Sequence, residues 1–216
     1  MPRFTLSCLV LSLSLAFLPT GAASAQTFEE AAEAYQAGDY TTALAGLREI
    51  ALGGNADAQL LLGTMLFNGE GVEADYIEGL RWFKSAADAG NPTAAFALAS
   101  AYRTGAGTAR NDGEARRYFE QASSGGLIAA KFELANMLAA GQGGSANSDR
   151  AVELFQEAAD ADHPGALYSM GAIYAAGELK PRDMSRAATY FRKAAEKGQA
   201  DAAYNLGLMM VEGTGV

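Results

Sequence analysis

The sequence predicts an all-α protein: an α-solenoid of stacked helix–loop–helix units that repeat with a 36-residue period. Residue types return at a fixed spacing, and residues that begin and end helices recur at the same places in each unit. A period of this size indicates stacked units, because one unit alone cannot bury its apolar face. The four clearest columns are Ala58, Ala94, Ala130, Ala166 and Ala202; Leu62, Leu98, Leu134, Met170 and Leu206; Gly63, Ala99, Ala135, Gly171 and Gly207; and Gly69, Gly105, Gly141, Gly177 and Gly213.

The first 25 residues have the layout of a secretory signal peptide. Arg3 is their only charge, residues 4–18 are largely apolar, and Ala23-Ser24-Ala25 is a small-x-small cleavage site. The apolar stretch is short for a membrane span. We therefore expect residues 1–25 to be removed and the mature chain to begin at Gln26, with a retained N-terminal anchor as the alternative.

Composition limits the classes of partner that are expected for the mature chain. Removing the signal peptide leaves about 191 residues without Cys8, the one cysteine, so helix packing alone must stabilise an exported protein. Arg3 is lost as well, which leaves 15 basic against 25 acidic residues and a net charge of −10. This balance disfavours nucleic acid and anionic membrane surfaces, which attract clustered Lys and Arg. We expect an exported protein without membrane insertion, in the periplasm, with full secretion as the alternative.

One unit shows how the sequence specifies two helices. Asn55 is an N-cap for a first helix from residue 56 to about residue 68, which Gly69 ends. After a short loop, Asp75 caps a second helix that stops at Gly90. Later units keep the same order of signals. The corresponding first-helix caps are Asn91 and His163, and the second-helix caps are Asn111, Asn147 and Asp183.

Bulky residues on the second helices predict the main packing within each unit. An aromatic residue or leucine is followed at once by phenylalanine, and alanine follows four residues after the first of the pair. These large groups face small first-helix columns, so that large and small residues interlock. The pairs are Trp82-Phe83, Tyr118-Phe119, Leu154-Phe155 and Tyr190-Phe191, and the alanines are Ala86, Ala122, Ala158 and Ala194.

The unit as a whole resembles the Sel-one-like repeat (SLR), a relative of the tetratricopeptide repeat. The resemblance rests on Ala-x-x-x-Leu-Gly, the Gly-x-Gly loop, Asp or Asn, the aromatic pair, Ala-Ala and Gly, and residues 200–207 are especially similar. It implies four full units and a final half unit over residues 55–216. Before them, the stretch from Ala34 to Leu44 is similar to a tetratricopeptide hairpin, which implies an N-terminal capping hairpin over residues 26–54.

The sequence offers little for catalysis. The Gly-x-Gly loops recur at nearly every turn and lack the strand and the Lys-Ser/Thr of a phosphate-binding loop. His163 is the only histidine and occupies a capping position, so we expect a structural role and no metal site or cofactor. Neither Gly-x-Ser-x-Gly nor Ser-x-x-Lys occurs. Some cysteine-rich exported SLR proteins are linked to β-lactam binding, but their paired cysteines are missing here.

One further column is the candidate partner-binding site. Its residues lie two positions before the Leu62 column, and by analogy with tetratricopeptide arrays they point toward the concave wall. One interpretation is an aromatic ladder that holds a peptide segment. The other is that the side chains fill the seam between neighbouring units. The ladder residues are Leu60, Phe96, Phe132, Tyr168 and Tyr204.

These observations predict a non-catalytic module that binds another protein of the cell envelope. Residues 132–147 and 163–166 are similar to periplasmic SLR regulators of proteobacteria, which implies a regulator that binds a sensor or envelope protein. The alternatives are an enzyme or enzyme-accessory protein acting on cell-wall or β-lactam substrates, and a secreted factor acting on a host.

The C-terminal end is expected to be exposed. A second helix should follow Gly213, yet Val216 ends the sequence, so Leu206, Met209 and Met210 lack a partner within their unit. A bare solenoid end is an apolar patch. We expect either a chain shorter than its natural product or an end buried by self-association or by a partner.

Overall fold

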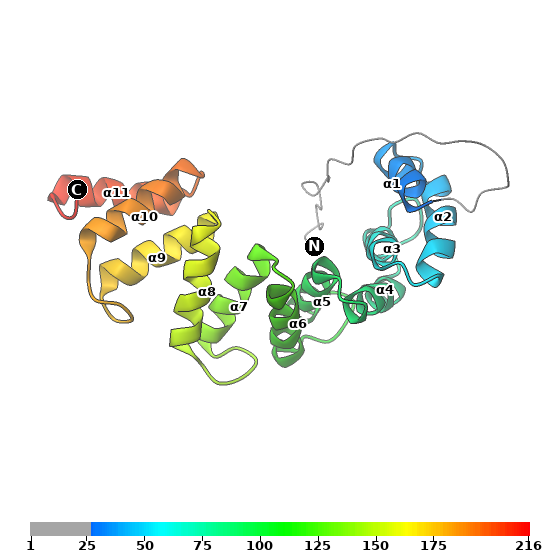
Figure 1. Ribbon diagram of the computed structural model, residues 1–216, viewed down its shortest axis with the longest axis horizontal. Helices are drawn as coiled ribbons and strands as arrows, with labels where there is room; N and C mark the ends of the chain where they lie inside the picture. The colour runs from blue at the N-terminus through cyan, green and yellow to red at the C-terminus, as the bar shows by residue number, and fades with distance from the viewer. Residues whose placement is uncertain (1–26) are drawn as a thin grey trace. The chain divides into compact units, whose positions relative to one another are not determined.

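The computed structural model describes residues 27–216, so the predicted signal peptide lies outside the described residues. The described part contains eleven α-helices and no strand (Figure 1). This confirms the prediction of an all-α solenoid with a 36-residue period. The helices fall into two compact units, one ending at Ala94 and the other covering Ala95–Val216.

The first unit pairs helices that follow one another in the chain. α1 packs on α2, α2 on α3, and α3 on α4. Leu47 and Leu62 are fully buried in a shared cluster, which joins the N-terminal hairpin to the first repeat. The helices are α1 (Phe28–Gln36), α2 (Tyr40–Leu52), α3 (Ala56–Asn68) and α4 (Tyr76–Asp88).

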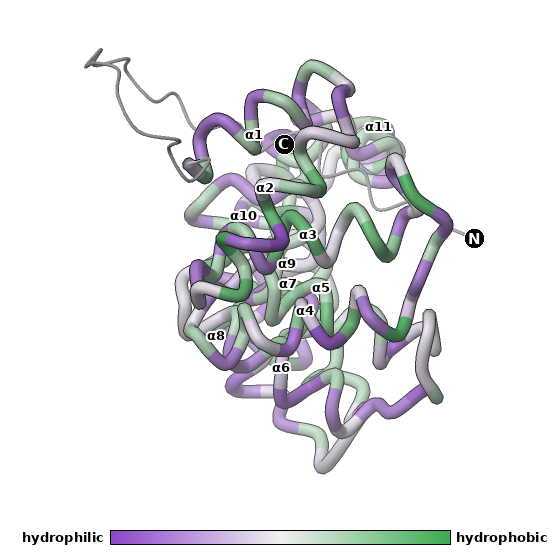
Figure 2. Tube along the Cα trace, turned by 90° about the vertical axis from the view of Figure 1, so that its right-hand side faces the viewer, coloured by the Kyte–Doolittle hydropathy of each residue, from purple (hydrophilic) through white to green (hydrophobic). Residues whose placement is uncertain are grey.

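The second unit continues the same succession of first and second helices. Hydrophobic residues recur in helix after helix in Figure 2, as expected of helices that each bury one side against a neighbour. α5 begins just before the boundary between the units. The helices are α5 (Pro92–Thr104), α6 (Asp112–Ser124), α7 (Ile128–Ala140), α8 (Ser148–Asp160), α9 (Pro164–Ala176), α10 (Met184–Glu196) and α11 (Ala200–Glu212).

The predicted caps are confirmed at both helix types. The Ala58 N–H donates to Asn55 Oδ1 at 2.9 Å, and the Ala94 N–H donates to Asn91 Oδ1 at the same distance. Each bond satisfies an amide that has no partner within its helix. The second helices are capped in the same way by Asp75, Asn111, Asn147 and Asp183.

The interlocking of large and small residues is also confirmed. A Cβ added to Gly63 would lie 2.8 Å from Phe83 Cδ1, and one added to Gly171 would lie 2.7 Å from Phe191 Cδ1. Each phenylalanine ring therefore rests on the backbone of the first helix. Such close approach requires a small residue beneath the ring.

One expectation about the C-terminal end is wrong. Met209 is only 5% exposed, because this side of α11 packs on α10. Leu206 is half-buried, whereas Met210 is 57% exposed. The sequence pattern alone did not show which side of α11 the preceding helix covers.

The loop between α7 and α8 supports a testable prediction about glycine. Gly143 has φ +73°, and a Cβ there would overlap the backbone carbonyl of Asp112. Gly126 has φ +87°, but a Cβ there would meet open space. Gly126→Ala is expected to cost about 1–2 kcal/mol for the left-handed backbone alone, and Gly143→Ala more than that. Urea unfolding of both variants tests this, and equal losses would contradict it.

Candidate functional site

The five ladder residues lie on the first helices, with Leu60 in the first compact unit and the other four in the second. Leu60, Phe96, Phe132 and Tyr168 are half-buried. Tyr204, on α11, is 67% exposed. Within the second unit, Phe96, Phe132 and Tyr168 therefore expose only part of their rings, whereas the Tyr204 ring is mostly exposed.

Three of the four ladder rings of the second unit pack on the phenylalanine of the following second helix. Ring centroids lie 5.4 Å apart for Phe96 and Phe119, and 5.9 Å apart for Phe132 and Phe155. The Tyr168 ring lies 5.7 Å from that of Phe191. These separations are typical of favourable aromatic pairs, so the rings are fixed in position.

Two of the ladder rings, those of Phe132 and Tyr168, also contact the next repeat. The Phe132 ring stacks on His163 with centroids 4.5 Å apart, and its Cζ lies 2.7 Å from where a Cβ on Gly165 would stand. Tyr168 Oη accepts a hydrogen bond from Asn205 Nδ2 at 3.5 Å. These two rings thus fill the seam between consecutive repeats, and only their remaining edges are available to a partner.

An ion pair joins two first helices beside the ladder. Arg103 Nη1 on α5 donates to Glu133 Oε2 on α7 at 2.5 Å, and the two side chains are 33% and 22% exposed. The Arg103 guanidinium also lies 5.3 Å from the centre of the Phe119 ring. The pair therefore links α5 to α7 and adds polar groups to the ladder side.

His163 caps α9, as predicted, and also stacks on the Phe132 ring of the ladder. Its Nδ1 accepts a hydrogen bond from the Ala166 N–H at 3.3 Å, so this nitrogen must be unprotonated. Burial lowers the pKa of His163 below its usual value, and the nearby carboxylate of Glu133 opposes this shift. The imidazole is therefore held neutral at the start of α9.

The protein is expected to become less stable on acidification, because protonation of His163 is less favourable in the folded than in the unfolded chain. Because its pKa is lower in the folded than in the unfolded chain, its contribution is fully present above the unfolded pKa of about 6.5. It is lost as the pH falls through the folded pKa. Urea unfolding at pH 7.5 and pH 5 measures this loss.

His163→Asn is the matched control, because Asn91 caps α5 with the same geometry and does not titrate. His163 is the only histidine, so the variant should lose most of the pH dependence between pH 5 and 7. An unchanged pH profile would contradict this assignment.

The column four residues after the ladder differs in burial from repeat to repeat. Its members are Thr64, Ser100, Asn136, Ala172 and Leu208. Varied residue types are expected of a surface that contacts a partner, but Thr64 and Ser100 are only 4% and 5% exposed. Thr64 Oγ1 donates to the Leu60 carbonyl within its own helix. Asn136 and Ala172 are half-buried and Leu208 is 43% exposed, so only the later repeats offer this column to solvent.

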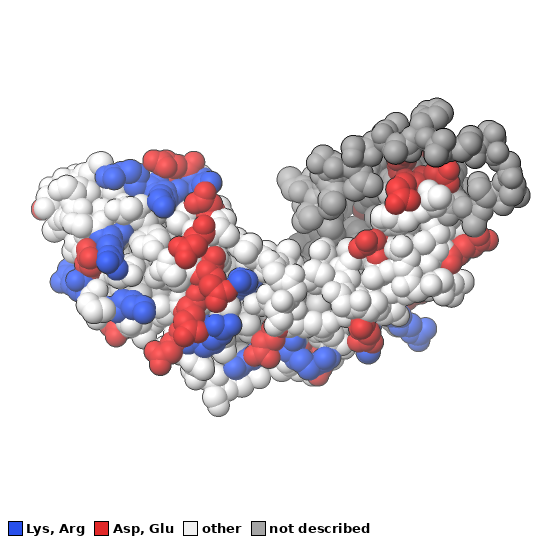
Figure 3. All heavy atoms as spheres, viewed as in Figure 1, with Lys and Arg blue, Asp and Glu red and all other residues white. Residues whose placement is uncertain are grey.

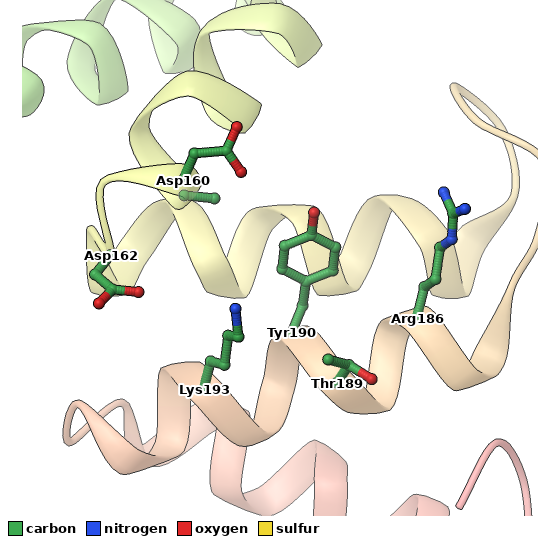
Figure 4. A pocket seen from close by; sticks show the side chains of 7 residues that line it. Asp160, Asp162, Arg186, Thr189, Tyr190 and Lys193 are labelled. Atoms are coloured by element: carbon green, nitrogen blue, oxygen red, sulfur yellow. The ribbon is translucent and has the colours of Figure 1, made fainter.

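A polar hollow of about 340 Å³ lies between α8 and α10 (Figure 4). Arg186, Tyr190 and Lys193 line its α10 side, and Asp160 and Asp162 line its α8 side. Most of these groups are already engaged; Asp162, for example, pairs with Lys197 at 3.1 Å. Sequence reasoning missed this hollow, because its residues come from second helices of two different repeats.

Charge on the second helices is mixed. Figure 3 shows a row of acidic side chains over α8, whose sequence places Asp149, Glu153 and Glu157 four residues apart. Arg150 pairs with Glu153 at 2.8 Å, and Lys131 reaches Glu157 from α7. These exposed pairs contribute little to stability and give this side a polar surface.

Residues 27–216 contain no group of three or more His, Cys, Asp or Glu side chains that could hold a metal ion. No helix among them has both the length and the apolarity to cross a membrane.

Comparisons with known proteins agree with the repeat pattern. The Sel1 repeat model matches residues 56–91, 92–127, 128–163, 164–199 and 200–216. A comparison with curated proteins gives no match.

Solved structures include similar chains. A protective antigen present in uropathogenic Escherichia coli strains, which displays an SLR fold, is 32% identical with a TM-score of 0.77. The alignment covers 80% of this chain and 37% of the antigen, so this chain spans little more than a third of that protein. A Sel1 repeat protein from Oxalobacter formigenes is 30% identical with a TM-score of 0.79, over 88% of this chain and 78% of that one.

Sel1 repeat proteins are generally non-catalytic scaffolds that mediate protein–protein interactions. With matched repeats running from residue 56 to residue 216 and two relatives at 30% identity or more, this chain belongs to the Sel1 repeat family.

Proposed function

We propose that this protein binds another protein of the bacterial cell envelope through its first helices and thereby acts as a non-catalytic regulator in the periplasm. One observation carries the proposal: the ladder rings of α5, α7 and α9 are anchored on second-helix phenylalanines yet are only partly buried. Rigid aromatic groups with accessible edges bind at low entropic cost, which is why aromatic residues dominate binding hot spots.

Polar neighbours would supply specificity on the same side. The Arg103–Glu133 pair lies beside the Phe119 ring, and Asn136 lies one turn after Phe132 on α7. A partner segment lying along these helices would meet aromatic edges alternating with hydrogen-bonding groups. A sensor or another envelope protein is the proposed partner class.

Site-specific photo-crosslinking in intact cells tests the binding surface. A photoreactive amino acid at Asn136 or Ala172, on first helices, is expected to capture the partner. The same group at Glu120 or Glu153, which are exposed on second helices with 55% and 62% of their side chains accessible, should not. Capture from the second helices alone would contradict the assignment.

The predicted export has its own measurement. Protein extracted from the cell envelope is expected to have the intact mass of a chain beginning at Gln26. A species that retains Cys8 would contradict signal-peptide cleavage and with it a freely diffusing periplasmic form.

A further inference from the structure

The hollow between α8 and α10 carries opposite charges on its two walls. Arg186 and Lys193 lie on the α10 wall, and Asp160 and Asp162 lie on the α8 wall. Figure 4 shows Asp162 at one end of the hollow and Arg186 at the other. Among the described residues, the Lys193 ammonium pairs with no carboxylate. The walls therefore present both signs of charge to an open space between them.

Asp162 brings its carboxylate to this hollow through a backbone conformation that favours glycine. Its φ is +59°, and no other non-glycine residue within residues 27–216 has a positive φ. The left-handed region is unfavourable for a residue with a side chain, and such outliers gather at functional sites. The equivalent positions of the N-terminal hairpin and the other repeats are all glycine: Gly54, Gly90, Gly126 and Gly198. The aspartate at this one position therefore points to a role for its side chain beyond folding.

Lys193 also differs from its counterpart in the preceding repeat. Thirty-six residues earlier, Glu157 pairs with Lys131 of α7 and lies 3.7 Å from Arg150. Leu167 takes the place of Lys131 on α9, so α9 has no charged side chain at that position. The Lys193 ammonium is therefore available to an anionic group that enters the hollow.

The groups between the two charged walls are fixed in place. The Tyr190 ring stacks on Tyr174 with centroids 5.7 Å apart and planes 10° apart, and Tyr190 Oη accepts a hydrogen bond from Gln156 Nε2 at 3.0 Å. Arg186 Nη1 donates to Tyr174 Oη at 3.2 Å, which holds the guanidinium beside this pair of rings. A ligand would therefore meet a surface that is already organised, which lowers the entropic cost of binding.

Charge complementarity decides which class of ligand fits. A simple anion would meet the carboxylates of Asp160 and Asp162, and a simple cation would meet Arg186 and Lys193. A molecule that carries both an ammonium and a carboxylate group is complementary to both walls. The volume of about 340 Å³ lies at the small end of the range for ligand pockets.

We propose that this hollow binds a small zwitterion, either a free amino acid or a dipeptide. Its ammonium group lies against the Asp160–Asp162 wall, and its carboxylate lies against the Arg186–Lys193 wall. The site is built from second helices and does not depend on the ladder surface proposed above.

Isothermal titration calorimetry of the purified protein with L-alanine and with L-alanyl-L-alanine tests the proposal. Saturable binding of at least one of them is expected, with a Kd below about 1 mM, and the probe that binds identifies the source of the zwitterion. Its N-acetylated and C-amidated forms, which each lack one charge, should bind at least about tenfold more weakly. No saturation by either probe up to about 10 mM, or equal binding of the blocked forms, would overturn the proposal.

Lys193→Gln is expected to weaken binding at least about tenfold. Arg192→Gln is the matched control, because Arg192 is the exposed neighbour on the same helix and does not line the hollow. It removes the same charge from the chain and should bind like the parent. Equal binding by the Lys193→Gln variant and this control would overturn the assignment of the α10 wall.

Asp162→Gly separates ligand binding from folding. It introduces the residue that the other repeats have and relieves the left-handed backbone, and the lost pair with Lys197 is exposed. The melting temperature should therefore not fall, while binding weakens at least about threefold. Unchanged binding, or a lower melting temperature with unchanged binding, would show that Asp162 serves the fold alone and would overturn the assignment of the α8 wall.

Discussion

Phe119→Ala is expected to lower the free energy of unfolding by about 3–5 kcal/mol, as truncation of a buried phenylalanine usually does. The Phe119 side chain is fully buried on α6. Its removal would also take the supporting surface from the Phe96 ring and from the Arg103 guanidinium. Urea unfolding followed by circular dichroism measures the loss.

The neighbouring Glu120→Ala is the control for Phe119→Ala. Its side chain is 55% exposed and makes only a 3.7 Å ion pair with Arg116. A surface change of this kind is expected to stay within about 0.5 kcal/mol. A loss below about 1 kcal/mol for Phe119→Ala would show that the cavity collapses and that the ring does not hold the repeat together.

Leu134→Ala is expected to cost about 2–5 kcal/mol, because Leu134 is 4% exposed and packs in the repeat core. Phe132→Ala is expected to cost less, about 2–3 kcal/mol, since the half-buried ring loses its contacts with Phe155 and His163 but was never fully removed from water. Paired urea unfolding and partner-binding measurements separate the two positions.

The comparison between these variants decides the role of the ladder. Weaker partner binding by Phe132→Ala beyond that of Leu134→Ala would show that the ring edge contacts the partner. Equal destabilisation of both variants with no separate effect on binding would assign Phe132 to the seam alone. Asn136→Ala, on the same side of α7, is the control expected to leave stability within about 0.5 kcal/mol.

Local chemistry explains why so much of the fold could be predicted. The cap at Asn55 and the stop at Gly69 bound α3 where the pattern places them, because capping depends on residues within one turn of each other. The Gly63–Phe83 contact was also predictable, since a repeated large–small pairing is visible as two columns with one period. Periodicity carries long-range information only when each repeat makes the same contact.

Contacts between side chains of neighbouring repeats could be identified only from the structure. The Phe132–His163 stack and the Arg103–Glu133 pair each occur once, so no repeated column of the sequence indicates them. The ladder illustrates the same limit, because its spacing is equally compatible with a groove and with a seam.

The sequence by itself therefore determined the class of fold, the repeat boundaries and the residues that cap and fill each unit, because these depend on short-range chemistry repeated every 36 residues. Only the tertiary structure decided which side of each helix its neighbour covers. That choice buries Met209 and leaves Tyr204 largely exposed on the same helix, because helix packing depends on which surfaces meet.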